Sequence, residues 1–131
     1  MVEETLKELN NQPFIMREQG SGTRESIVKL LTENNLSVKV KLELGSNEAI
    51  KQAIYGGLGI SILSEHSLFS EGMSGDLTIL DFKHFPLKRR WYVAYLAGKK
   101  LSVIAETFLD YLLEESPKMS FPQSSILARL N

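Results

Sequence analysis

The chain contains no cysteine, which excludes a disulfide framework and any metal site built on thiolates. Net charge is also nearly absent, because 15 lysines and arginines almost balance 16 aspartates and glutamates. We therefore expect no long-range attraction to nucleic acid or to an anionic membrane. No apolar run reaches the ~18 residues of a membrane span, and residues 1–13 are too charged for a signal peptide. These absences predict a soluble chain in the cytoplasm, with no membrane partner.

Side chains typical of catalysis are sparse as well. The two histidines, His66 and His84, have a spacing that matches no metal site. No serine stands in a Gly-x-Ser-x-Gly motif, and Asp76, Asp81 and Asp110 form no recognisable carboxylate pair. We expect no enzyme activity, no metal and no cofactor.

What the chain does have is an alternation of strand and helix periodicity over residues 3–82. Its 131 residues, 43% of them apolar, suit one hydrophobic core. Strands are expected at 14–17, 38–44, 59–63 and 77–82, and helices at 3–9, 23–34, 47–55 and 65–69. This order predicts an α/β fold with a mostly parallel sheet flanked by helices.

The pattern changes after residue 86. An aromatic-rich strand is expected at 90–96, and Ser102 then begins the longest helix, which runs to about Glu115. The apolar face of this helix is wide, so it must bury against something. Prolines and serines mark residues 116–131 as a tail.

Residues 20–23 have the chemistry of an anion pocket. This Gly-Ser-Gly-Thr turn follows an apolar run and begins a helix, so the hydroxyls of Ser21 and Thr23 and the helix dipole favour negative charge. Arg17 and Arg24 flank the turn and offer charge-assisted hydrogen bonds. The alternative is a turn that only caps its helix, with both arginines at the surface. Nucleotide binding is weakly supported, because the turn matches neither the dinucleotide fingerprint nor the phosphate loop.

A second such turn, Gly45-Ser46-Asn47, again joins a strand to a helix. Open α/β sheets bind ligands at the carboxyl ends of their strands, so we expect Ser46 and Asn47 at the same ligand. For Ser46 alone an ordinary helix cap explains the pattern equally well. The basic run at 88–90, beside Trp91 and Tyr92, is interpreted as solvent-exposed rather than as a nucleic-acid contact.

Together these motifs resemble the regulatory domain of LysR-type transcriptional regulators. The resemblance covers about residues 5–115 and rests on residues 13–24, 45–53 and 57–63. Residues 85–93, 98–102 and 107–112 are similar to the carbon-fixation branch of that family, which controls carboxylase and carbon-uptake genes in cyanobacteria, plastids and autotrophic bacteria.

This resemblance implies one lobe of a type 2 periplasmic-binding-protein-like fold. Residues 1–96 would form the second lobe with a crossing strand, and residues 97–115 the helix of an otherwise absent first lobe. The lobe would bind a small anionic metabolite, such as a phosphorylated sugar or acid or 2-oxoglutarate, and an absent N-terminal winged helix-turn-helix would bind DNA. The residues expected at the effector are Arg17, Ser21, Gly22, Thr23, Arg24, Ser46 and Asn47.

The resemblance also implies pairing between copies, through Thr23–Leu44 and the apolar helix Ser102–Glu115. The location would be the cytoplasm, or the stroma in a plastid. A lobe of a solute-binding transport protein is the alternative, although it should carry an export signal, and none is visible. An enzyme that uses the same turn is a third possibility, but it lacks an evident base, metal site or nucleophile.

Overall fold

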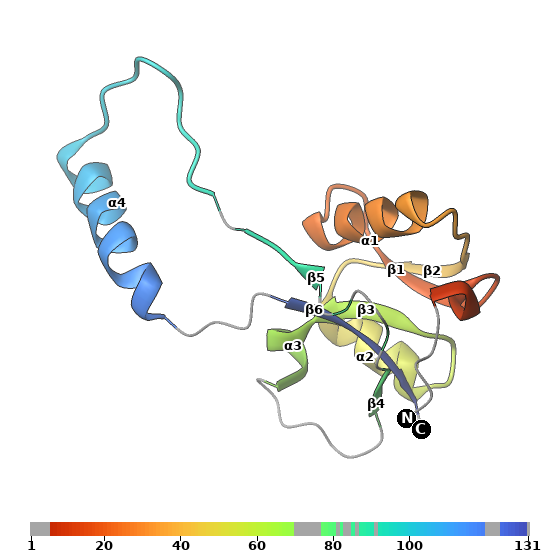
Figure 1. Ribbon diagram of the computed structural model, residues 1–131. Coiled ribbons are helices and arrows are strands. Elements are labelled where there is room, and N and C mark those ends of the chain that lie inside the picture. Colours follow the sequence, from red (N-terminus) through yellow and green to blue (C-terminus); the bar gives the residue numbers. More distant parts are fainter. Residues whose placement is uncertain are drawn as a thin grey trace.

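The computed structural model describes residues 6–69, 77–80, 82, 85, 87–90, 92–119 and 124–130. Strands and helices alternate from β1 to β4, which confirms the α/β class (Figure 1). The elements are η1 (Leu6–Leu9), β1 (Pro13–Arg17), α1 (Gly22–Glu33), β2 (Lys39–Leu44), α2 (Asn47–Tyr55), β3 (Ser61–Ser64), α3 (Glu65–Phe69), β4 (Leu77–Leu80), β5 (Leu87–Lys88), α4 (Val103–Glu115), η2 (Ser116–Lys118) and β6 (Ser124–Leu130).

β1 and β2 are parallel neighbours, in a register that places Arg17 opposite Leu44. Both strands therefore end at the same edge, and the turn that follows each of them begins there. The predicted placement of the two turns at one carboxyl edge is confirmed.

β1 is also joined to the segment that leads into β3. Phe14 and Ile60 form a parallel bridge. The N–H of Ile15 donates to the carbonyl of Ile60 (2.9 Å), and the N–H of Ile60 donates to the carbonyl of Pro13 (3.0 Å). The buried Ser61 hydroxyl adds a hydrogen bond to the carbonyl of Ile15 (2.7 Å). These bonds fix the strand that carries the first turn.

Two apolar clusters pack on opposite faces of β1, as the alternation of side chains along a strand requires. Phe14 and Met16 belong to the cluster that includes Ile27 of α1, whereas Ile15 packs with Ile50 and Ile54 of α2. The apolar residues that recur at helical spacing are buried in both helices: Ile27, Leu30 and Leu31 in α1, and Ile50, Ala53 and Ile54 in α2. Helices thus cover both faces of the strand, and only its ends are free to reach solvent.

β6 lies between β3 and β4 and is antiparallel to both, and β5 pairs with β6 as well. The tail predicted for residues 116–131 is therefore wrong for Ser124–Leu130. The proline and serine content around residue 120 describes only local preference, whereas β6 forms because its backbone groups hydrogen-bond to two strands more than 40 residues earlier in the chain.

The strand predicted at 90–96 is also wrong for the residues described there, which have no regular structure. Tyr92 is 81% exposed and Leu96 73% exposed. A strand requires a hydrogen-bonded neighbour, and the described residues provide none for this segment. Trp91 lies outside the described residues, as do His84, Asp76 and Asp81.

α4 begins as predicted, because the Ser102 hydroxyl accepts from the N–H of Ala105 (3.2 Å). No residue of α4 is buried, although Ile104 and Phe108 are large and apolar. The helix stands apart from the α/β body (Figure 1). The burial expected for its apolar face is not supplied by the described part of this chain. None of the described helices has the length and apolarity to cross a membrane.

Candidate anion-binding site

The turn after β1 is built as the sequence predicts. Gly20 adopts a positive φ (+85°), which turns the chain from β1 toward α1. Ser21 is the N-cap of α1, and its hydroxyl accepts from the N–H of Arg24 (3.4 Å). Ser21 and Thr23 are both at least nine-tenths buried, and no partner of the Thr23 hydroxyl is seen among the described residues. A buried hydroxyl without a partner is costly, so this one is poised to bind an incoming group.

A hollow of about 570 Å³ opens beside this first turn of α1. Residues of the turn line it together with three guanidinium side chains, one from the end of β1 and two from the segment after β5. The lining residues are Arg17, Ser21, Gly22, Thr23, Glu25, Ser26, Arg89 and Arg90. First-turn N–H groups have no partner within a helix, and the helix dipole places partial positive charge at this end. The arrangement favours a small anion, and the exposed Glu25 carboxylate is the acidic group that opposes it.

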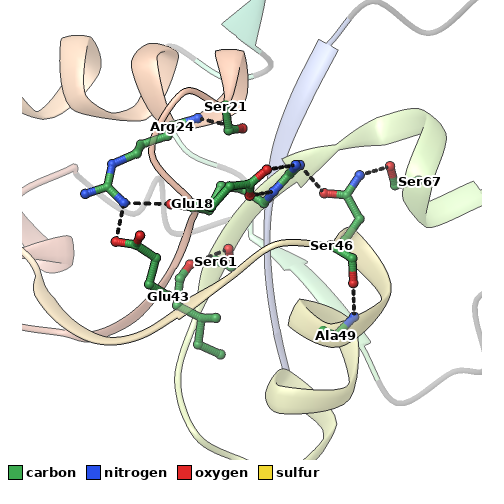
Figure 2. Close-up of polar contacts among 11 residues, drawn as sticks. Glu18, Ser21, Arg24, Glu43, Ser46, Ala49, Ser61 and Ser67 are labelled. Atoms are coloured by element: carbon green, nitrogen blue, oxygen red, sulfur yellow. Dashed lines mark hydrogen bonds and ion pairs between the residues drawn. The ribbon is translucent and has the colours of Figure 1, made fainter.

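Arg17 connects the two turns. Its Nε and Nη2 donate to the carboxylate of Glu18 (2.7 and 2.9 Å), and its Nη1 donates to Oδ1 of Asn47 (2.9 Å). Asn47 in turn donates from Nδ2 to the Ser67 hydroxyl (2.6 Å). Figure 2 shows this series of contacts running from Glu18 toward Ser67.

Pairing of Arg17 with Glu18 changes the pKa of both side chains. The hydrogen bond from Arg17 lowers the pKa of the Glu18 carboxyl below its ordinary value, and the same bond raises the pKa of Arg17. Both groups therefore stay charged, and two of the donor groups of Arg17 are already engaged by an internal carboxylate.

Ser46 and Asn47 have different roles. The Ser46 hydroxyl accepts from the N–H of Ala49 (3.1 Å) at the N-terminus of α2, and the residue is exposed, as the capping alternative predicts. Neither residue is among those that line the hollow at the first turn. Asn47 reaches the hollow through its hydrogen bond to Arg17, whereas Ser46 does not contact it.

Arg24 lies on another side of α1. Its Nη1 donates to the carbonyl of Arg17 (2.7 Å) and pairs with Glu43 of β2 (2.5 Å), as Figure 2 shows. It lines a different hollow, of about 640 Å³, along the outer face of α1. Successive residues of a helix differ in direction by about 100°. Thr23 and Arg24 therefore face different surfaces, and the described contacts of Arg24 tie α1 to β2.

The basic run at 88–90 is exposed at Lys88 and Arg90, as the sequence predicts, whereas Arg89 is half-buried; nothing in the sequence indicates that Arg89 and Arg90 line this hollow. Arg89 brings its Nη1 to 3.3 Å from the position that a Cβ on Gly22 would occupy. Local sequence contains the basic cluster but no sign of which helix it approaches. His66 is exposed, and the described part of the chain contains no group of three metal-ligating side chains.

Comparison with known proteins identifies the family of the chain. Residues 2–117 match the model of the LysR substrate binding domain. The chain is 52% identical over 119 residues to the HTH-type transcriptional activator CmpR of Synechocystis, covering 91% of this chain and 39% of that protein. It is 46% identical over 108 residues to a RuBisCO operon transcriptional regulator of Acidithiobacillus ferrooxidans, covering 82% of this chain and 35% of that protein. The chain thus spans well under half the length of these relatives.

The chain is also similar to a solved regulatory domain. The CcmR regulatory domain of Synechocystis, in complex with 2-PG, is 60% identical, with a TM-score of 0.79, and the match covers 88% of this chain and 55% of that chain. The strand and helix order, the two carboxyl-edge turns and these matches lead to one conclusion. The chain belongs to the LysR substrate binding domain family, and its relatives include regulators of carbon-fixation genes.

Proposed function

We propose that this chain is the effector-sensing part of a LysR-type transcriptional regulator, and that it binds a small anionic metabolite in the hollow beside the first turn of α1. The observation that carries the proposal is the buried Thr23 hydroxyl, which lines that hollow together with Arg17 and Arg89. The regulated genes would be those of carbon fixation or inorganic-carbon uptake, as the names of the relatives suggest.

The ligand class follows from the donors. N–H groups, hydroxyls and guanidinium groups all donate hydrogen bonds, and such bonds to charged acceptors are worth about 1.5–3 kcal/mol each. A phosphorylated acid fits best, and the CcmR regulatory domain was solved with 2-PG, that is, 2-phosphoglycolate. Phosphorylated sugars and 2-oxoglutarate carry the same kind of charge and are the other candidates.

The sensing mechanism is a shift of population rather than catalysis. An anion that binds one arrangement of the regulator better than another favours that arrangement by its differential affinity. The site contains hydrogen-bond donors but no nucleophile with an adjacent base among the described residues, and the relatives named above are regulators. Regulation therefore fits better than an enzymatic or a transport function. We place the protein in the cytoplasm, or in the stroma of a plastid, where transcription occurs.

Pairing and DNA binding would involve other surfaces. Val28 of α1 and Val40 of β2 are about half exposed, within the segment Thr23–Leu44 that the family resemblance assigns to pairing. The exposed apolar face of α4 would add a second contact between copies. DNA binding is assigned to a different segment of the whole regulator, because the charge of this chain is balanced.

Calorimetric titration of the chain with 2-phosphoglycolate tests the proposal. Thr23→Ala should weaken binding about tenfold or more, since it removes one hydrogen bond of about 1.5–3 kcal/mol to the charged anion. Ser46→Ala should change the affinity less, because its hydroxyl does not line the hollow. Thr32→Ala is the matched control, because this exposed hydroxyl bonds to the carbonyl of Val28 on the same helix. Equal affinity of the Thr23 variant and the parent chain would move the site elsewhere.

A further inference from the structure

Arg89 lies directly over the N-terminus of α1. It follows β5, is half-buried, and brings a guanidinium nitrogen to 3.3 Å from the place of a Cβ on Gly22. It also lines the same hollow as Thr23. No ion pair or hydrogen bond of Arg89 is seen among the described residues.

This position is electrostatically unfavourable for a cation in the absence of a ligand. The N-terminus of a helix has partial positive charge, and cations are preferred at the opposite end. Arg17 lines the hollow too, but Glu18 already balances its charge. Glu25 lines the same hollow and Glu33 lines the neighbouring one beside Arg89, but no ion pair of Arg89 with a carboxylate is seen among the described residues.

Among the described residues, the hollow therefore combines two guanidinium groups without an ion pair, those of Arg89 and Arg90, with a helix N-terminus and the buried Thr23 hydroxyl, for which no partner is seen. Of the two guanidinium groups, that of Arg89 belongs to a half-buried residue and lies against Gly22, whereas Arg90 is exposed.

We propose that Arg89 determines the ligand specificity of this site, by forming a subsite for a doubly charged group with the first turn of α1. The inference rests on the proposed function and specifies, in addition, that the bound group of the ligand carries two negative charges. A phosphate monoester carries close to two charges above its second pKa of about 6, and it has three acceptor oxygens. The N–H groups of Gly22 and Thr23 donate hydrogen bonds to one side of the phosphate group, and the planar pair of donors on Arg89 donates to two of its oxygens.

The selectivity follows from this division of contacts. A singly charged carboxylate such as glycolate satisfies the helix end alone and leaves Arg89 uncompensated. A phosphate dianion satisfies both. Arg89 thus acts as a binding residue that distinguishes phosphorylated from unphosphorylated acids, and its contribution grows as the phosphate loses its second proton.

The test compares Arg89→Gln with Lys88→Gln in calorimetric titrations with 2-phosphoglycolate and with glycolate between pH 5.5 and pH 8. Lys88 is the matched control, because its substitution removes the same charge from the adjacent residue, and Lys88 lines a neighbouring hollow but not this one. Arg89→Lys, which keeps the charge but loses the planar donor pair, should fall between the two.

In the parent chain, the affinity for 2-phosphoglycolate should rise as the pH passes about 6 and exceed that for glycolate. Arg89→Gln should weaken 2-phosphoglycolate binding about tenfold at pH 8 and flatten its pH dependence, with little effect on glycolate. Lys88→Gln should stay within about twofold of the parent chain.

Three results would overturn the inference, each in a distinct way. Unchanged affinity and pH dependence in Arg89→Gln would remove Arg89 from the site while leaving the Thr23 turn in place. Equal losses in the Arg89 and Lys88 variants would show an effect of net charge alone. Failure of the parent chain to bind 2-phosphoglycolate at all would overturn the proposed function together with this inference.

Discussion

Among the glycines that the structure describes, Gly59 should be the least replaceable. Its φ is +157°, and a Cβ added there would overlap the carbonyl oxygen of Pro13 and come within 3.0 Å of the carbonyl carbon. The overlapped atoms are backbone, so no side chain can rotate away. Gly59→Ala must therefore push β1 away from the segment leading to β3.

The magnitude follows from the bonds at that junction. Moving Pro13 breaks the hydrogen bond from the N–H of Ile60 (3.0 Å) and disturbs that from Ile15 to Ile60 (2.9 Å). Two such bonds contribute about 1–3 kcal/mol together, and backbone strain at a non-glycine residue adds about 1–3 kcal/mol. We expect a loss of about 2–6 kcal/mol in the free energy of unfolding, a large share of the ~5–15 kcal/mol typical of a domain.

Two other glycines provide matched controls. Gly57 has a positive φ (+70°) but no atom within 4 Å of an added Cβ, so Gly57→Ala should cost about 1–2 kcal/mol from conformation alone. Gly45 has neither a close neighbour nor a positive φ, and Gly45→Ala should stay within about 0.5 kcal/mol of the parent chain.

Urea denaturation followed by circular dichroism at the helix band measures all three variants. The order of cost should be Gly59, then Gly57, then Gly45. A Gly59→Ala variant as stable as Gly57→Ala would refute the reasoning, because it would show that β1 and the β3 segment are not held in this close approach.

Substitutions at three further positions probe the site and its support. Ser61→Ala should lower the free energy of unfolding by about 1–3 kcal/mol in urea denaturation, because it leaves a buried carbonyl of β1 without its hydroxyl donor. Ser46→Ala should cost about 1 kcal/mol as the loss of an N-cap, whereas Ser46→Gly should cost only a few tenths; equal losses would argue against capping. Glu18→Gln frees donor groups of Arg17 and should tighten 2-phosphoglycolate binding several-fold by calorimetry. The hydrogen bond from Arg17 lowers the pKa of the Glu18 carboxyl in the folded chain below its ordinary value of 4.5. The contribution of Glu18 to the free energy of unfolding is therefore complete above pH 4.5 and is lost as the pH falls through the folded pKa. The Glu18→Gln variant should not show this part of the loss of stability in acid.

Features set by adjacent residues could be predicted from the sequence. Ser21, Ser46 and Ser102 were recognisable as the start of helices because a hydroxyl just before a helical pattern accepts a first-turn N–H, and all three do so. The buried face of α1 followed from the spacing of Ile27, Leu30 and Leu31 in the same way.

Features set by distant parts of the chain could not be predicted. β6 depends on backbone partners in β3 and β4, which leave no trace in the composition around residue 120. The position of Arg89 over Gly22 depends on how the segment after β5 packs on α1. The sequence also does not show that Thr23 lines the hollow whereas its neighbour Arg24 turns toward Glu43, because that depends on how α1 packs beside β2.

Amide chemical shifts of the ¹⁵N-labelled chain, followed during titration with 2-phosphoglycolate, test the location of the anion most directly. We predict that the largest saturating changes fall on the amides of Gly22 and Thr23, which begin α1 and line the hollow. Smaller changes should occur at Asn47, which is connected to the site through Arg17. The account would be contradicted if the largest changes fell on Val28 and Thr32, which lie on the outer face of α1. It would also be contradicted if no residue showed a saturable change.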